Sequence, residues 1–97
     1  MYQIDFNHPI HIYFVGIGGI SMSGLAEVLR EKGFQVSGSD KQVSPLTKSL
    51  EEKGITVFYG QRAANITPDI DCAVFTSAIH PDNPEYIAVH RLGIPCL

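Results

Sequence analysis

The sequence predicts an α/β domain built on a doubly wound parallel sheet, and three observations lead to this prediction. Runs rich in β-branched and aromatic residues alternate with amphipathic segments in units of about 20 residues. Two runs, 11–15 and 72–76, are almost continuously apolar, as expected for parallel strands that helices cover on both faces. A glycine-rich segment directly follows the first run. Ligands of such sheets bind beyond the carboxyl ends of the strands, so a site is expected there.

Composition sets limits on this domain and on its partners. The chain has 97 residues, 44% of them hydrophobic and 18% charged, which fits one globular domain with a modest core. The formal net charge of -3 includes no basic cluster, so we expect no nucleic-acid partner. No apolar stretch approaches the roughly 18–20 residues that span a bilayer, and the start lacks a signal-peptide pattern. We therefore expect a cytoplasmic protein without a membrane partner.

The two cysteines, Cys72 and Cys96, each lie inside an apolar run. This setting favours reduced core thiols over a disulfide, a metal site or a catalytic role. The four histidines are spread along the chain without metal-ligand spacing, so we expect no metal site.

About five strands are expected in the Rossmann-like sheet, at residues 11–15, 34–37, 56–59, 72–76 and 94–97. Pro95 restricts the last of them to an edge. The segment 61–68 is compatible with a short helical turn or a loop, because its alanines favour the first and its Asn65 and Pro68 the second.

Three helices are expected between these strands. The first is predicted over 22–32, with an inward stripe made of Met22, Leu25, Ala26 and Leu29. The second follows the N-cap Ser44 and turns Leu46 and Leu50 toward the core. The third begins at the N-cap Asn83, where Glu85 places an acid near the positive end of the helix dipole. A glycine ends each helix.

The glycine loop carries the strongest functional signal. Gly16, Gly18 and Gly19 lie between the first strand and the first helix, where glycines let backbone N–H groups approach an anion at a helix N-terminus. This arrangement predicts a phosphate or pyrophosphate site, with Ser21 and Ser23 as added donors. The alternative is that the glycines only permit a sharp turn and close packing. Ser21 replaces the third glycine of the dinucleotide fingerprint G-x-G-x-x-G, which disfavours plain NAD binding.

Asp40 lies after the second strand, about 20 residues beyond the glycine loop. Rossmann-like sites place an acid at this point to accept hydrogen bonds from ribose hydroxyls. The residue therefore predicts a ribonucleotide ligand, and the alternative is a solvated turn-forming aspartate.

Three ordered motifs resemble the N-terminal domain of the Mur ligases. They are the glycine loop with the helix start after it, the segment 36–40, and the segment 76–79 followed by 83–85. The resemblance implies that the domain holds the UDP part of UDP-N-acetylmuramate, with the glycine loop on the diphosphate and the loops after strands two and four around the uridine. Ser21 stands where the family more often has glycine, and Thr76 where it often has serine. The site residues implied are Gly16, Gly18, Gly19, Ile20, Ser21, Met22, Ser23, Asp40, Ser77, Ala78 and His80.

The resemblance also implies a larger enzyme. In the family, an ATP-binding central domain and a C-terminal domain follow, and ATP with Mg drives amide-bond formation between the muramyl carboxylate and L-alanine. Residues 1–97 contain no G-x-x-x-x-G-K-[ST] loop, so we expect this domain alone to hold no cofactor and to be inactive. Two alternatives remain: an NAD-type or nucleotide-sensing domain, and a related ligase that attaches a recycled peptide.

Overall fold

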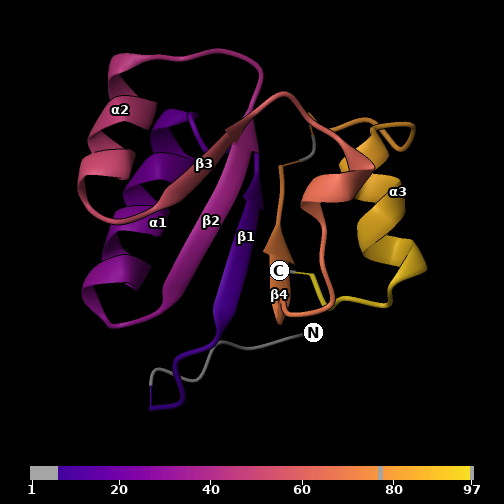
Figure 1. Ribbon diagram of the computed structural model, residues 1–97, viewed down its shortest axis with the longest axis horizontal. Helices are drawn as coiled ribbons and strands as arrows, with labels where there is room; N and C mark the ends of the chain where they lie inside the picture. Colours follow the sequence, from indigo (N-terminus) through magenta and orange to yellow (C-terminus); the bar gives the residue numbers. More distant parts are fainter. Residues whose placement is uncertain (1–6, 77, 97) are drawn as a thin grey trace.

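The computed structural model describes residues 7–76 and 78–96. It confirms the α/β fold with a parallel sheet, whose strand order is β3-β2-β1-β4 (Figure 1). Every pairing in this sheet is parallel. The strands are β1 (His11–Val15), β2 (Gln35–Asp40), β3 (Thr56–Tyr59) and β4 (Cys72–Val74).

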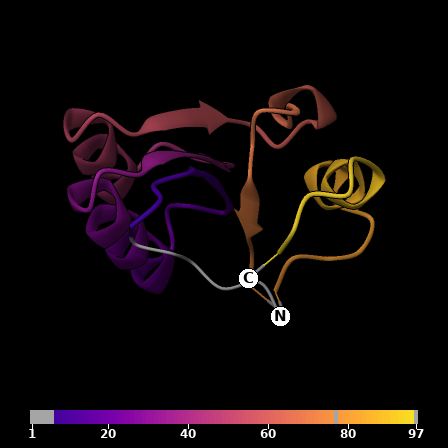
Figure 2. The ribbon, with the colours of Figure 1, turned by 90° about the horizontal axis from the view of Figure 1, so that it is seen from below.

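Helices cover the two faces of the sheet unequally. The α-helices α1 (Ile20–Glu31) and α2 (Pro45–Glu52) pack on one face. The helix α3 (Pro84–Arg91) and the short 3-10 helix η1 (Ala63–Asn65) lie on the other (Figure 2). Among the described residues, no helix is long and apolar enough to cross a membrane.

The alternation of side chains along β1 divides the core in two. Ile12 and Phe14 belong to the cluster under α1 and α2, while Tyr13 and Val15 belong to the cluster under α3. All four are buried, because successive residues of a strand point to opposite faces and both faces of this strand are covered. This explains why the run at 11–15 has no polar alternation.

The expected fifth strand is reduced to one bridge within the described residues. Cys96 pairs in parallel with Ala73, and the Ala73 N–H donates to the Pro95 carbonyl at 2.8 Å. Pro95 has no N–H to continue a ladder, which is consistent with so short a contact. The second strand, in contrast, runs to Asp40, three residues further than expected.

Two of the side chains expected in the core are partly exposed to solvent. Leu25 is 39% exposed and Leu46 is 40% exposed. Ser23 and Thr47 are buried instead. The Thr47 side chain accepts from the Ser44 N–H at 2.9 Å while the Ser44 hydroxyl accepts from the Thr47 N–H at 3.2 Å, which completes a capping box. The prediction for Leu46 was wrong because this cap turns Thr47 inward.

The carboxylate of Glu85 is fully buried at the start of α3. It accepts from the Ser39 hydroxyl at 2.6 Å and from the Tyr13 hydroxyl at 3.0 Å. It also accepts from the Asn65 amide at 2.8 Å and from the Arg62 N–H at 3.1 Å. The Arg62 N–H and the Asn65 amide group can only donate, and the two hydroxyl groups complete the hydrogen bonding of the carboxylate. Burial and the nearby Glu85 charge raise the pKa of Tyr13 well above its usual value.

We predict that Glu85→Ala lowers the free energy of unfolding by about 3–5 kcal/mol, since four donors lose their buried acceptor. Urea denaturation followed by circular dichroism measures this change. Glu52→Ala, at an exposed position in α2, is the matched control and should stay within about 0.5 kcal/mol. Equal effects of the two substitutions would contradict the role given to Glu85.

Candidate functional site

The loop between β1 and α1 is tied closely to β2. The N–H groups of Gly16 and Ile17 both donate to the Ser39 carbonyl, at 2.9 and 2.8 Å. Gly16 has a φ of 84°, which favours glycine. A Cβ at Gly38 of β2 would lie 2.6 Å from the Phe14 carbonyl oxygen, so only glycine fits where the two strands meet the loop.

Gly18 and Asp40 form a direct contact within the expected site. The Gly18 N–H donates to Asp40 Oδ2 at 2.8 Å. The other carboxylate oxygen, Oδ1, accepts from the Gln42 N–H at 3.3 Å. The sequence predicted that the N–H groups of the glycine loop bind a diphosphate. In the structure, one of them, the Gly18 N–H, is already bonded to the Asp40 carboxylate.

The N-terminus of α1 differs from those of the other α-helices. Ser44 and Asn83 cap α2 and α3 with their side chains, whereas the N-cap of α1 is Gly19 and makes no side-chain hydrogen bond. Within α1, the first N–H with a backbone acceptor is that of Ser23, which donates to the Gly19 carbonyl at 2.8 Å. In the described part of the chain, the N–H groups of residues 20–22 have no acceptor. Such a helix start can hold an anion.

A cavity of about 560 Å³ lies at the carboxyl ends of the strands. Four of the residues expected from the sequence line it: Gly16, Asp40, Ala78 and His80. They come from the ends of β1 and β2 and from the segment after β4. The structure thus brings together residues from three separate parts of the sequence.

The remaining expected residues fall into two groups. Gly18, Gly19, Ile20 and Ser21 form the loop and the exposed or half-buried start of α1, and Ile20 is 84% exposed. Met22 and Ser23 are buried, and the Ser23 hydroxyl donates to the Ile20 carbonyl at 3.0 Å. These two side chains therefore face the protein, and because the Ser23 N–H donates to Gly19, only the Met22 N–H remains for a ligand. Ser77 lies outside the described residues.

Sequence reasoning missed other lining residues, among them Lys41, Gln61 and Asp82. Lys41 could have been found, because it directly follows Asp40 at the end of β2. Gln61 lies in the segment 61–68, whose structure the sequence left open. Asn83 was identified only as a helix cap, although it also lines the cavity.

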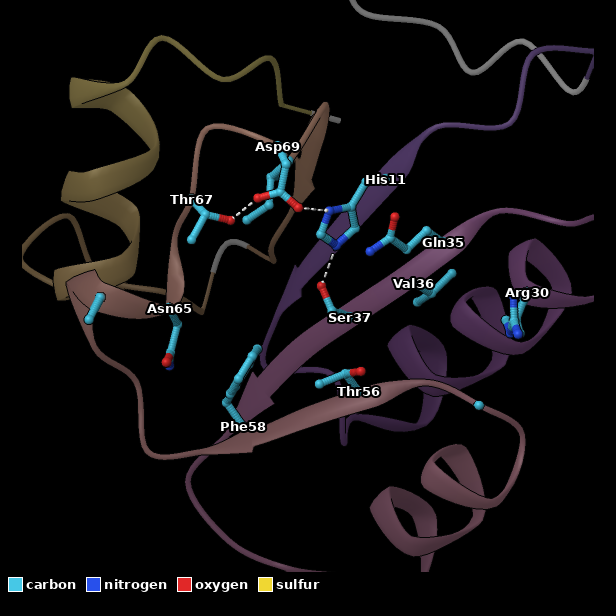
Figure 3. Close-up of a pocket in the computed structure, with 13 residues that line it drawn as sticks. His11, Arg30, Gln35, Val36, Ser37, Thr56, Phe58, Asn65, Thr67 and Asp69 are labelled. Atoms are coloured by element: carbon cyan, nitrogen blue, oxygen red, sulfur yellow. Dashed lines mark hydrogen bonds and ion pairs between the residues drawn. The ribbon is translucent and has the colours of Figure 1, made fainter.

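A second cavity, of about 440 Å³, lies at the opposite end of the sheet (Figure 3). Its lining includes the first residues of three strands, His11, Gln35 and Thr56. His11 lies between Asp69 and Ser37 in the row of hydrogen bonds that Figure 3 shows, with Nδ1 3.2 Å from Asp69 Oδ2 and Nε2 2.7 Å from Ser37 Oγ. The order of groups is that of a serine hydrolase triad.

This row is better explained as a structural link than as a nucleophilic site. Ser37 is buried in the middle of the sheet, paired with Tyr13 of β1 and Thr56 of β3. Its backbone is part of these ladders and leaves no N–H donor for an oxyanion. The hydrogen bond from Thr67 is the main cause that lowers the pKa of Asp69, with smaller contributions from a backbone N–H and from the His11 ring, so this carboxylate is kept as an ionised acceptor.

The cysteines and histidines show no reactive setting among the residues described. Burial raises the pKa of Cys72 to about 11 and also raises that of Cys96, so both thiols are protonated at neutral pH. Within residues 7–76 and 78–96, no group of three or more His, Cys, Asp or Glu side chains could hold a metal ion.

The parallel sheet, the glycine loop after β1 and the cavity at the carboxyl ends of the strands define a Rossmann-like α/β domain. The family model described as "Mur ligase family, catalytic domain" matches residues 11–97. The chain belongs to the Mur ligase family.

Individual relatives agree with this assignment. The chain is 63% identical over 97 residues to the UDP-N-acetylmuramate--L-alanine ligase of Agathobacter rectalis, and it spans 21% of that protein. A solved UDP-N-acetylmuramate-alanine ligase from Thermotoga maritima is 36% identical with a TM-score of 0.85, over 90% of this chain and 20% of that one. A UDP-N-acetylmuramate:L-alanyl-gamma-D-glutamyl-meso-diaminopimelate ligase from Neisseria meningitides is 35% identical with a TM-score of 0.84, over 93% and 28%.

We predict opposite effects of two glycine substitutions near the start of α1. A Cβ at Gly18 would lie 2.6 Å from Asp40 Oδ2, so Gly18→Ala should lower the free energy of unfolding by about 1–3 kcal/mol. A Cβ at Gly24 meets nothing within 4 Å, and Gly24→Ala should raise the same quantity by about 0.5–1 kcal/mol. Urea denaturation of both variants measures these changes. If Gly18→Ala leaves the free energy of unfolding unchanged, the close contact between Gly18 and Asp40 is contradicted.

Proposed function

We propose that this chain is the UDP-N-acetylmuramate-binding, N-terminal domain of a cytoplasmic, ATP-dependent ligase that joins L-alanine to that nucleotide sugar in peptidoglycan synthesis. The observation that carries this proposal is the 63% identity to the Agathobacter rectalis ligase over the whole of the chain. The chain spans about a fifth of that relative's length, so the proposal extends to a longer protein. Domains for ATP with Mg and for the amino acid would then follow this one, and the 97 residues alone would have no turnover.

The geometry supports a nucleotide diphosphate at the carboxyl-end cavity. The uncapped start of α1 supplies backbone N–H donors, and no acid lies in its first turn to compete for them. Lys41 adds a positive charge at the cavity. Because Asp40 holds the Gly18 N–H, we assign the diphosphate to the N–H groups of residues 20–22. This places the negative charge of the diphosphate at the N-terminus of α1, which is the positive end of the helix dipole.

Asp40 is proposed to accept a hydrogen bond from the ribose. Its Oδ2 is committed to Gly18, but Oδ1 has only the long 3.3 Å contact with the Gln42 N–H and remains available. The same carboxylate would then position both the loop and the sugar. The residues that follow β4, Ala78 and His80, would contact the part of the ligand on the other side of the loop.

A ligase that attaches a peptide to the same nucleotide sugar is the second candidate. The observation in its favour is the Neisseria meningitides structure, which matches this chain about as well as the Thermotoga maritima one does. The 63% identity to an L-alanine ligase favours the first candidate.

Calorimetric titration of the 97-residue chain tests the proposed ligand. We expect binding of UDP-N-acetylmuramate and of UDP, with NAD and ATP weaker by about tenfold or more, a difference of roughly 1.4 kcal/mol. Preference for NAD would contradict the proposal and support the dinucleotide-binding alternative.

We predict that Asp40→Ala weakens UDP binding by about 1–3 kcal/mol, because it removes a charged acceptor from the ribose. The loss should be much smaller with 2'-deoxy-UDP, if the 2'-hydroxyl is the main contact. Titrations of both proteins with both ligands form a cycle that isolates this interaction. Asp82→Ala removes another carboxylate of the same cavity and is the control. Equal losses with the two ligands would show that Asp40 shapes the loop rather than contacting the ribose.

A further inference from the structure

The side-chain amide of Gln61 is held in one orientation by the cap of α3. Asn83 Oδ1 accepts from the N–H groups of Glu85 and Tyr86, at 2.9 and 3.3 Å. This leaves Asn83 Nδ2 to donate, and it donates to Gln61 Oε1 at 2.7 Å. Because the partner of an N–H donor must be an acceptor, Gln61 turns its oxygen to Asn83 and its Nε2 group away from it.

The Nε2 group of Gln61 is available to a ligand. Gln61 is half-buried and lines the carboxyl-end cavity. In the described ranges of the chain, its Nε2 has no hydrogen-bond partner. The residues on either side are fixed, since the Arg62 N–H donates to Glu85 at 3.1 Å and the Gly60 N–H donates to the Asp40 carbonyl at 2.9 Å. Gln61 therefore presents a fixed donor to the cavity, without a competing acceptor.

The strand order indicates which part of a nucleotide this donor meets. Neighbouring strands are about 4.8 Å apart, so the end of β3 lies roughly 10 Å from the end of β1, with β2 between them. The diphosphate is assigned to the start of α1, which follows β1, and the ribose to Asp40, which ends β2. Gln61 follows β3, one strand further in the same direction. The base is the next group of the nucleotide along that path.

We propose that Gln61 Nε2 donates to the O4 carbonyl of uracil and distinguishes it from cytosine, with Asn83 as the positioning residue. Cytosine carries an amino group in place of O4, so two donors would face each other and one hydrogen bond would be lost. This inference rests on the proposed function, since it assigns the base within the same UDP site.

The ratio of the dissociation constants for CDP and UDP tests this assignment. For the unmodified chain we expect UDP to bind about tenfold more tightly than CDP, an amount that one hydrogen bond supplies. Gln61→Glu keeps an acceptor for Asn83 but presents an acceptor to the base, so the ratio should fall below one. Its added negative charge acts on both diphosphates alike and cancels in the ratio.

Asn83→Asp tests the positioning role separately. Aspartate caps α3 as well as asparagine does, so the unfolding midpoint should not change. It accepts at the position where Asn83 donates, so Gln61 turns its Nε2 group to the aspartate and its oxygen to the cavity, and the ratio should fall below one. Gln35→Glu, at the other end of the sheet, makes the same charge change and should leave the ratio unaltered.

Different results would overturn the role of Gln61 and the UDP site itself. Tight UDP binding with an equal affinity for CDP, or an unchanged ratio in Gln61→Glu, would overturn the assignment of Gln61 and leave the UDP site standing. An unchanged ratio in Asn83→Asp would overturn the positioning role. Binding of neither nucleotide would overturn the proposed function and this inference together.

Discussion

The buried carboxylate of Glu85 joins the elements that frame the candidate site. Its hydrogen bonds reach Tyr13 on β1, Ser39 on β2, and Arg62 and Asn65 around η1. Glu85 itself lies in the first turn of α3, so the sheet, the loop after β3 and the helix start are held together at one point. A charge without a counter-ion is costly to bury unless its hydrogen bonds are satisfied, and here four donors satisfy it. The positions of Gln61 and Asn83 beside the cavity depend on this arrangement.

The sequence predicts the order of strands and helices because its local signals are strong. Proline and a capping side chain mark the starts of α2 and α3, glycines of positive φ follow the helices, and apolar runs mark β1 and β4. The same local signals do not show how completely a side chain or a strand is covered. Leu25 and Leu46 fit an inward stripe but lie at its edges, and the fifth strand is limited by Pro95.

In the candidate site, prediction is limited by contacts between residues far apart in the sequence. Glu85 has the sequence context of an exposed acid at a helix N-terminus, and nothing nearby in the chain indicates that partners from β1 and β2 bury it. The spacing of Asp40 from the glycine loop predicts a ribose contact but not the hydrogen bond to Gly18. Gln61 has no motif of its own, because its orientation follows from the cap of a helix more than 20 residues later. Such contacts depend on the assembled fold.

The central claim is that the nucleotide sugar binds at the carboxyl ends of the strands and not in the cavity around His11. An NMR titration of the ¹⁵N-labelled chain with UDP-N-acetylmuramate tests it most directly, because both cavities are observed in one experiment. We expect saturable shifts of the amide signals of Ile20, Ser21, Lys41 and Ala78, while those of Gln35, Ser37 and Thr67 should not move. Shifts confined to the second group, or no shifts at all, would contradict it.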